Sequence, residues 1–177
     1  MAMDHFYHKR DAFMSIGLII ILIVAASLVV GPIMMMRPNP VQKKKENMRM
    51  LARQQGVHYS IRNLPQQADE LEKPQPIPVY FLPPTETASP SNWMLLRTRY
   101  EHDIHFLGWW AWRNEARPTN AEQTVLREYL PILPESIRAL SAGAEGITVY
   151  WEEQGGELVL QQILQLLKSL QAAAIQK

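Results

Sequence analysis

The longest hydrophobic segment of the chain is an uninterrupted run near its N-terminus. No charged residue occurs from Ala12 to Met36, and the centre of this run is almost entirely Ile, Leu and Val. A helix rises about 1.5 Å per residue and the hydrocarbon core of a bilayer is about 30 Å thick, so about 20 apolar residues are enough to cross it. The pattern predicts a transmembrane helix over residues 14–36, preceded by a short tail, residues 1–13.

A cleaved secretory signal is the alternative interpretation of this run, because Lys9 and Arg10 precede it. The apolar run is longer than the hydrophobic region of a signal peptide, and the residues from Pro32 to Arg37 do not resemble a small-residue cleavage site. The sequence therefore favours a membrane anchor that is retained.

Basic residues are distributed unequally about the predicted span. Lys9 and Arg10 precede it, and a larger group follows it: Arg37, Lys43, Lys44, Lys45, Arg49 and Arg53. Positive charge near a membrane helix marks the cytoplasmic side, so we expect a bacterial inner-membrane protein with its N-terminus outside and its C-terminal domain in the cytoplasm. The same six residues are predicted to face anionic lipid headgroups, each contributing about 1 kcal/mol near the surface.

Residues 37–56 are predicted to form a basic juxtamembrane helix. Asn39 and Pro40 are a plausible start and Gly56 a plausible stop, while Met48 and Ala52 belong to a narrow apolar stripe. Such a helix suits the headgroup layer or a single docking partner. A solvated spacer helix is the alternative.

Residues 57–76 are predicted to be a Pro-rich linker that begins with a short strand. Val57, Tyr59 and Ile61 alternate with polar residues, as in a half-buried strand. The following residues, 65–76, are rich in Pro and charge and carry too little apolar surface to pack.

Residues 77–177 are predicted to form a cytoplasmic domain of the α+β class. Ile77–Leu82 has the composition of a strand, and Pro78 is typical of an edge strand. Residues 93–100 and 104–113 are rich in β-branched and aromatic residues, which predicts a β-hairpin with a three-residue turn at 101–103.

The second half of this domain is predicted to be mainly helical. Thr119 and Glu122 form a capping-box pattern before a helix that breaks at Pro131, and the pattern predicts that the helix resumes from Pro134 until Gly143. A strand at Ile147–Trp151 and a turn at 154–156 follow. Residues 157–174 have one broad apolar face, which predicts an amphipathic helix, with a hairpin through Leu160 as the alternative.

Composition excludes several classes of protein. The chain has no cysteine, so disulfides and thiolate metal sites are absent. Net charge is +5 over residues 1–56 and −4 over 57–177, and the acidic remainder argues against nucleic-acid binding. Glycine-rich phosphate loops, nucleophile elbows and paired metal-ligand motifs are also missing from the sequence. We therefore expect no catalytic residues and no cofactor.

The best metal-ligand pattern is formed by His102 and His105 with Glu101 and Asp103 beside them, since imidazole and carboxylate groups together suit zinc or iron. A membrane-tethered enzyme is the function that such a site would support. The predicted hairpin places His102 in a turn and His105 on a strand without an obvious third ligand, so a polar hairpin tip is favoured. His5 and His8 are predicted to be polar residues at the outer membrane interface.

The same hairpin carries most of the tryptophans. Trp109, Trp110 and Trp112 lie close in sequence to arginines, including Arg97, Arg99 and Arg113, which allows cation–π pairs or a base-stacking surface. Packing in the core is the favoured interpretation. Trp109 and Trp110 are adjacent, however, so on a strand they point to opposite faces. We expect one of them to be exposed as the anchor for a protein partner.

Residues 32–51 carry a local pattern: Arg37-Pro38, then Gln42, the lysines 43–45, Glu46 and an amphipathic segment that includes Leu51. This order resembles the YajC family, the small single-span accessory subunits of the bacterial Sec translocase. The resemblance implies a shared anchoring device. It is confined to these residues, because the family continues into a compact β domain and this chain continues into a Trp-rich one.

The sequence thus predicts a non-enzymatic inner-membrane protein that tethers a protein-binding domain beside a membrane complex. Tethering raises the local concentration of the domain near membrane partners. A sensor of anionic lipid surfaces, acting through the basic segment, is a further alternative to the enzyme already considered.

Overall fold

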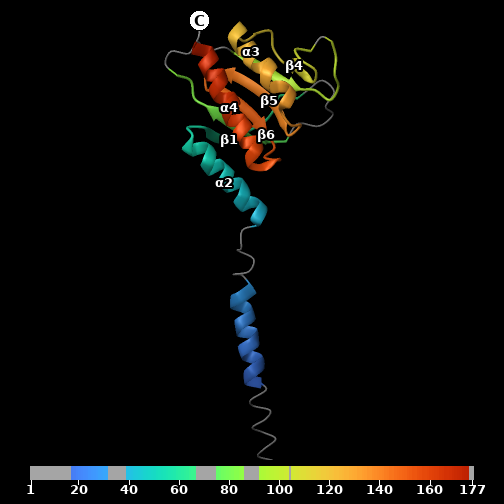
Figure 1. The fold of residues 1–177 in the computed structure, drawn as a ribbon. Helices are drawn as coiled ribbons and strands as arrows, with labels where there is room; N and C mark the ends of the chain where they lie inside the picture. Colours follow the sequence, from blue (N-terminus) through green and yellow to red (C-terminus); the bar gives the residue numbers. More distant parts are fainter. Residues whose placement is uncertain (1–16, 32–38, 67–74, 86–91, 104, 176–177) are drawn as a thin grey trace, which may run out of the picture. The chain divides into compact units, whose positions relative to one another are not determined.

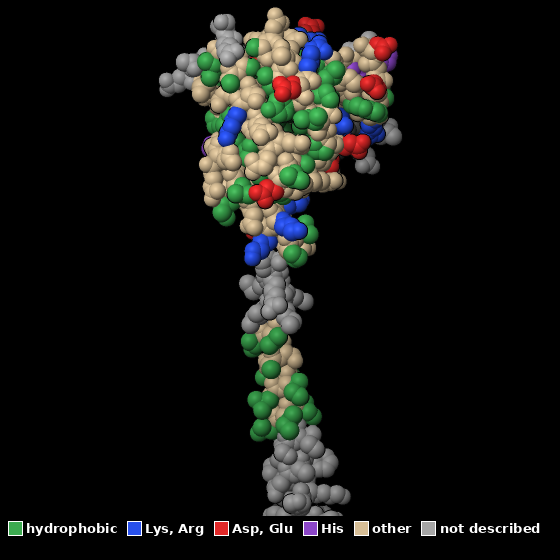
Figure 2. Space-filling model, in the orientation of Figure 1, with side chains coloured by type: hydrophobic (Ala, Val, Ile, Leu, Met, Phe, Trp, Pro, Cys, Tyr) green, Lys and Arg blue, Asp and Glu red, His purple; other side chains and the backbone are tan. Residues whose placement is uncertain are grey.

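The computed structural model describes residues 17–31, 39–66, 75–85, 92–103 and 105–175, and divides into two compact units, Met1–Lys43 and Lys44–Lys177. The first unit contains a helix, Gly17–Gly31, that carries no charged side chain (Figures 1 and 2). Its Ser27 hydroxyl donates to the Ile23 carbonyl at 2.8 Å. This bond satisfies the polar group within the helix. The predicted tail, the two ends of the predicted span, and His5 and His8 lie outside the described residues.

The second unit is of the α+β class, as predicted. Its six strands form one antiparallel sheet in the order β1-β2-β6-β5-β3-β4. The strands are β1 (His58–Arg62), β2 (Ile77–Leu82), β3 (Trp93–Arg97), β4 (Trp110–Trp112), β5 (Ile137–Gly143) and β6 (Gly146–Trp151). The helices are α2 (Pro40–Gln54), α3 (Asn120–Tyr129) and α4 (Gly156–Ile175), with a 3₁₀ turn, η1 (Leu130–Ile132), after α3.

One face of the sheet is covered by α3 and α4, which lie side by side across it (Figure 1). The side chains that point to this face include successive register partners on four strands: Tyr80, Val149, Leu140 and Leu95. They are buried with the inner side of α4, whose buried residues are Val159, Leu160, Ile163, Leu164, Leu166, Leu167, Leu170 and Ala173. Since successive strand residues point to opposite faces, the main core lies between the sheet and these helices.

The opposite face of the sheet carries a smaller apolar cluster. Its members are Ile77, Val79, Leu96, Ala139 and Tyr150, against which Leu64 and Met94 pack. Leu64 belongs to the segment that follows β1 and crosses this face. The two faces therefore differ: one holds the helical core and the other a small cluster beside polar residues.

Helix α4 is long and apolar enough to cross a membrane by length and composition, whereas the described helix Gly17–Gly31 is shorter. The inner side of α4 forms part of the main core, and its Lys168 donates to the side chain of Gln55 at 2.6 Å. These contacts are those of a core helix in a folded domain. The predicted amphipathic helix is confirmed, with one extra residue at each end, and the alternative hairpin is absent.

Helix α2 begins at Pro40, the predicted start, and ends at Gln54, just before the predicted stop at Gly56. From Lys44 onward it belongs to the compact domain, with Met48 and Ala52 buried in the main core. Strand β1 pairs with β2 over its whole length. The compact unit thus begins well before residue 77 and takes in segments that the sequence pattern assigned to a juxtamembrane helix and a linker. Residues 67–74 of that linker lie outside the described residues.

The prediction of a helix from Pro134 to Gly143 was wrong, because Ile137–Gly143 is strand β5 in the middle of the sheet. A β-bulge at Arg138 explains the error. Ile137 pairs with Trp151 and Ala139 pairs with Tyr150, so Arg138 has no cross-strand partner. The bulge brings Ile137 and Leu140 to the same face. Two buried residues of this strand are therefore three positions apart, which is also the spacing of buried residues on one face of a helix.

The predicted turn between β3 and β4 needs correction. β3 and β4 are an antiparallel pair, as predicted, but residues 98–109 connect them rather than a three-residue turn.

The predicted edge position of β2 was also wrong. β2 lies inside the sheet, although Pro78 suggested an edge. Pro78 pairs with Ile61 of β1, and the ladder with β6 begins only at Val79. The missing N–H of Pro78 therefore falls outside the β2–β6 ladder.

Candidate functional site

A buried carboxylate joins α2 to the sheet domain. Arg49 donates to Glu153 through two nitrogens, with Nε to Oε1 at 2.7 Å and Nη2 to Oε2 at 2.8 Å. The Tyr80 hydroxyl donates to the same Oε1 at 2.9 Å, and the Lys45 ammonium lies 3.5 Å from Oε2. The side chain of Glu153 has no exposed surface. A bidentate arginine–carboxylate pair fixes orientation as well as distance, so it sets how α2 is placed against the domain.

Electrostatics at this centre favour the charged form of the carboxylate. Burial raises the pKa of Glu153, but the hydrogen bonds from Arg49 and Tyr80 and the charges of Arg49 and Lys45 outweigh burial and hold that pKa below its usual value. The hydrogen bond to Glu153 raises the pKa of Arg49. Burial and the neighbouring carboxylate raise the pKa of Tyr80. Glu153 is therefore ionised, and Arg49 and Tyr80 are protonated, at neutral pH.

The backbone that carries Glu153 is held in an unusual conformation. Glu153 has a φ of 58°, the one positive φ of a non-glycine residue in the described part of the chain. The adjacent Gln154 carbonyl accepts from the Trp151 indole Nε1 at 2.9 Å, and Ser136 Oγ lies 3.3 Å from the same oxygen. A left-handed conformation costs a non-glycine residue about 1–2 kcal/mol, so the surrounding contacts must offset this strain to keep the carboxylate in place.

The structure separates the six basic residues predicted to face lipid. Lys45 and Arg49 face Glu153, and the Arg49 guanidinium also lies 4.2 Å from the centre of the Tyr59 ring. Lys43, Lys44 and Arg53 are exposed. Arg37 lies outside the described residues. Glu153 itself was missed by the sequence analysis, because its neighbours Gln154 and the two glycines indicated only a turn. The sequence did contain one signal for a buried carboxylate: Lys45 and Arg49 are four residues apart, so both basic groups lie on one side of the helix.

The tryptophans of β4 are core residues. Trp110 is 3% exposed, with Arg97 stacked 5.5 Å from its ring centre. Trp112 is half-buried and packs edge-to-face against Trp93 at 6.1 Å. Arg97 donates to the carbonyls of Leu133 and Pro134, both at 3.1 Å. Burial lowers the pKa of Arg97. This part of the Trp–Arg cluster stabilises the fold.

Trp109, in contrast, is 43% exposed and lies in the loop before β4. Its carbonyl accepts from the Thr98 backbone N–H at 2.8 Å, so the backbone beneath the indole ring is fixed. Tyr100 is 55% exposed in the same loop and contacts His105, with 5.3 Å between ring centres. Exposed aromatic side chains such as Trp109 and Tyr100 are typical of protein contact surfaces. We name residues 98–109 the aromatic loop.

The predicted metal ligands, Glu101, His102, Asp103 and His105, all belong to the aromatic loop. The rings of His102 and His105 are 6.0 Å apart, and His105 Nδ1 lies 2.9 Å from the Gly108 carbonyl oxygen. Within the described ranges, no three His, Asp or Glu side chains are placed so that they could share a metal ion. The geometry gives His105 a role in shaping the loop.

The comparisons with known proteins give no relatives for this chain: no family model, curated protein or solved structure matches it.

Proposed function

We propose that this chain is a single-pass protein of the bacterial inner membrane, without enzymatic activity, whose cytoplasmic α+β domain binds another protein beside the membrane. The observation that carries the proposal is the helix Gly17–Gly31. Its large apolar side chains are exposed all round, from 47% at Val30 to 71% at Leu28. A helix that is apolar on every side is stable only in an apolar environment.

The length of the apolar segment supports a membrane span. The described helix is about 22 Å long at 1.5 Å per residue, and uncharged residues continue beyond both its ends. With those residues the segment is long enough for a hydrocarbon core of about 30 Å. The excess of basic residues after it favours a cytoplasmic domain.

The aromatic loop supports binding of a protein. Trp109 combines a large exposed ring with a backbone that is held in place, and such residues contribute strongly to binding energy. Because the chain from Gly31 to Lys44 is short, the domain stays close to the bilayer and meets membrane partners at a raised local concentration. An accessory place beside the Sec translocase, the complex of the YajC family, is one case of this proposed function.

Membrane attachment and topology are tested first. The full chain is expected to stay with membranes after alkaline washing and to dissolve only in detergent, whereas the chain lacking residues 14–36 is expected in the soluble fraction. The absence of native cysteine permits a clean topology test with Glu128→Cys, an exposed position on α3. A membrane-impermeant maleimide should label this cysteine only after the cells are opened. Labelling of intact cells would contradict the cytoplasmic location.

Partner binding is tested by purifying the tagged full chain from native membranes in mild detergent. We expect a membrane protein at near-equal stoichiometry, lost with Trp109→Ala and retained with Arg99→Gln, a matched exposed substitution in the same loop. Translocase subunits in the complex would support the YajC resemblance. Recovery of the chain by itself, or equal capture by the Trp109→Ala variant, would contradict binding through the aromatic loop.

A further inference from the structure

The two edges of the six-stranded sheet differ. At one edge, the aromatic loop pairs with β4: Leu107 forms an antiparallel bridge with Trp110, and the Phe106 N–H donates to the Trp110 carbonyl at 2.8 Å. At the other edge, β1 pairs with β2 along one side, and no residue in the described ranges pairs with its other side. An edge strand of this kind presents backbone N–H and C=O groups that can pair with a further strand.

Strand β1 lacks the features that keep an edge strand from pairing. Such strands are commonly interrupted by proline or a bulge, whereas β1 contains no proline and pairs with β2 in register over five consecutive residues. Tyr59 and Ile61 lie opposite Tyr80 and Pro78, on the sheet face that the helices cover. Ile61 is nevertheless 59% exposed. A regular edge strand with an exposed β-branched side chain is suited to pairing with another chain.

The sequence of β1 complements itself in the antiparallel orientation. A register centred on Ser60 pairs all five residues of the strand with those of a second copy. Opposite residues point to the same face, so Ile61 lies opposite Tyr59 of the second copy, and the two-fold axis repeats this pair. Pairs of an aromatic and a β-branched residue stabilise antiparallel strands. Registers centred on Tyr59 or Ile61 would pair only three residues of the strand.

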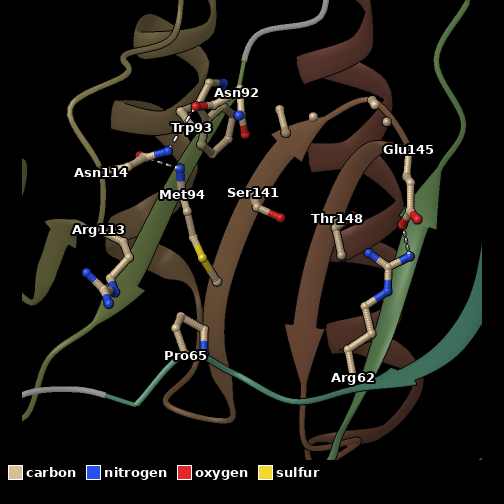
Figure 3. A pocket seen from close by; sticks show the side chains of 14 residues that line it. Arg62, Pro65, Asn92, Trp93, Met94, Arg113, Asn114, Ser141, Glu145 and Thr148 are labelled. Carbon is tan, nitrogen blue, oxygen red and sulfur yellow. Dashed lines mark hydrogen bonds and ion pairs between the residues drawn. The ribbon is translucent and has the colours of Figure 1, made fainter.

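The charge on β1 is directed away from the free edge. Arg62 forms an ion pair with Glu145 beside the cavity on the sheet face that lies away from α3 and α4 (Figure 3). The Arg62 guanidinium also lies 5.2 Å from the centre of the Phe81 ring, which belongs to β2. In the register centred on Ser60, Arg62 would lie opposite His58 of the second copy, so the two Arg62 side chains would not face each other.

We propose that two copies of this chain associate through β1 and join their sheets into one antiparallel sheet. A pair of five-residue strands is a small interface, below the about 1,200 Å² of stable complexes. The membrane anchor proposed above would hold the copies on one surface and raise their local concentration. This last step rests on the proposed anchor. The pairing itself does not depend on the protein partner, because the aromatic loop lies at the other edge of the sheet.

Cysteine cross-linking tests the register, because the native chain has no cysteine. In the proposed dimer the two Ser60 Cα atoms are about 4.5–5.5 Å apart, within the range of a disulfide. The two Ile61 Cα atoms are about 8 Å apart, which is too far. Full chains are oxidised in opened cells, so that membrane-bound and soluble chains are both tested. We expect several times more covalent dimer with Ser60→Cys than with Ile61→Cys, or with Glu128→Cys on α3.

A second substitution tests the apolar contact between the copies. In the Ser60→Cys chain, Ile61→Lys places on the edge a charge of the kind that prevents strand pairing and should lower the yield of covalent dimer about tenfold. Ile132→Lys is the matched control, because Ile132 is 58% exposed and belongs to η1. It should leave the yield unchanged. Thermal unfolding shows whether each variant keeps the fold.

The pairing is overturned if Ser60→Cys gives no dimer or gives a mixed disulfide with a different protein instead. It is also overturned if Ile61→Cys or Glu128→Cys cross-links as well as Ser60→Cys, or if Ile61→Lys and Ile132→Lys have equal effects. The alkaline wash described above decides the anchor separately. A specific Ser60→Cys dimer in a chain that washes off the membranes would support the pairing and contradict the anchor.

Discussion

At the scale of single residues, Glu153 is the side chain on which the placement of α2 depends most. Glu153→Gln keeps the shape and removes the charge that Arg49 and Lys45 face. Hydrogen bonds to charged groups contribute about 1.5–3 kcal/mol each, and we expect the variant to lose about 2 kcal/mol at pH 7. Urea unfolding of a chain of residues 37–177 measures this. Glu145→Gln is the control, because it removes an ion pair whose carboxylate is 68% exposed and costs less than about 1 kcal/mol.

The pH dependence of this pair follows from the direction of the shift. The pKa of Glu153 is lower in the folded chain than in the unfolded one, so its contribution is complete above the unfolded value of about 4.3. The contribution is lost as pH falls through the lower, folded pKa. The wild type should therefore lose stability below about pH 4.3 more steeply than Glu153→Gln. If the free energies of unfolding of the wild type and Glu153→Gln fell equally with pH, the ion pair between Glu153 and Arg49 would be contradicted.

Two neighbouring tryptophans offer a third prediction at this scale. Trp110→Ala empties a buried site and is expected to cost about 3–5 kcal/mol. Trp109→Ala removes a ring that is 43% exposed and should cost less than about 1 kcal/mol. Thermal or urea unfolding of the two variants separates them. Equal losses would mean that Trp109 belongs to the core and is unsuited to be a binding anchor.

At the scale of elements, the sequence pattern located most helices and strands, and its errors have physical causes. The capping box was confirmed in full, with Glu122 accepting from the Thr119 N–H at 2.8 Å and Thr119 Oγ1 accepting from the Glu122 N–H at 3.2 Å. The two residues of a capping box are only three positions apart, so the sequence alone is enough to recognise it. The bulge at Arg138 and the inner position of β2 depend on partners that are distant in sequence. The Glu153 centre was missed for the same reason, since it joins α2, β2 and the segment after β6.

The β5–β6 hairpin depends on a glycine that no other residue can replace. Gly146 has a φ of 101°, and a Cβ at this position would lie 2.0 Å from the Leu82 carbonyl oxygen. Because the obstacle is backbone, Gly146→Ala must shift the hairpin against β2, and we expect it to cost well over 2 kcal/mol. Gly156→Ala is the matched control, with a φ of 71° and no atom within 4 Å. It should cost only about 1 kcal/mol, and similar losses would contradict the steric argument.

At the scale of the whole molecule, the contacts that α2 makes in the compact domain change the expected role of the basic segment. The sequence suggested six equivalent basic residues on the membrane surface. In the folded domain Lys45 and Arg49 are engaged by Glu153, whereas Lys43, Lys44 and Arg53 are exposed. The basic cluster therefore contains two groups of residues. Lys45 and Arg49 hold α2 against the sheet through Glu153, and the exposed Lys43, Lys44 and Arg53 form the other group.

This division predicts unequal effects on lipid binding. For a chain of residues 37–177, the triple variant Lys43→Gln, Lys44→Gln and Arg53→Gln should weaken binding to anionic vesicles by about 1 kcal/mol per charge, or about 100-fold in all, at low salt. Arg49→Gln should weaken vesicle binding less and lower the stability of the domain more, because it leaves Glu153 buried without its main partner. Vesicle sedimentation and urea unfolding measure the two effects. Binding that is equal on neutral vesicles, or is lost equally in both variants, would show that charge on α2 does not direct the domain to the membrane surface.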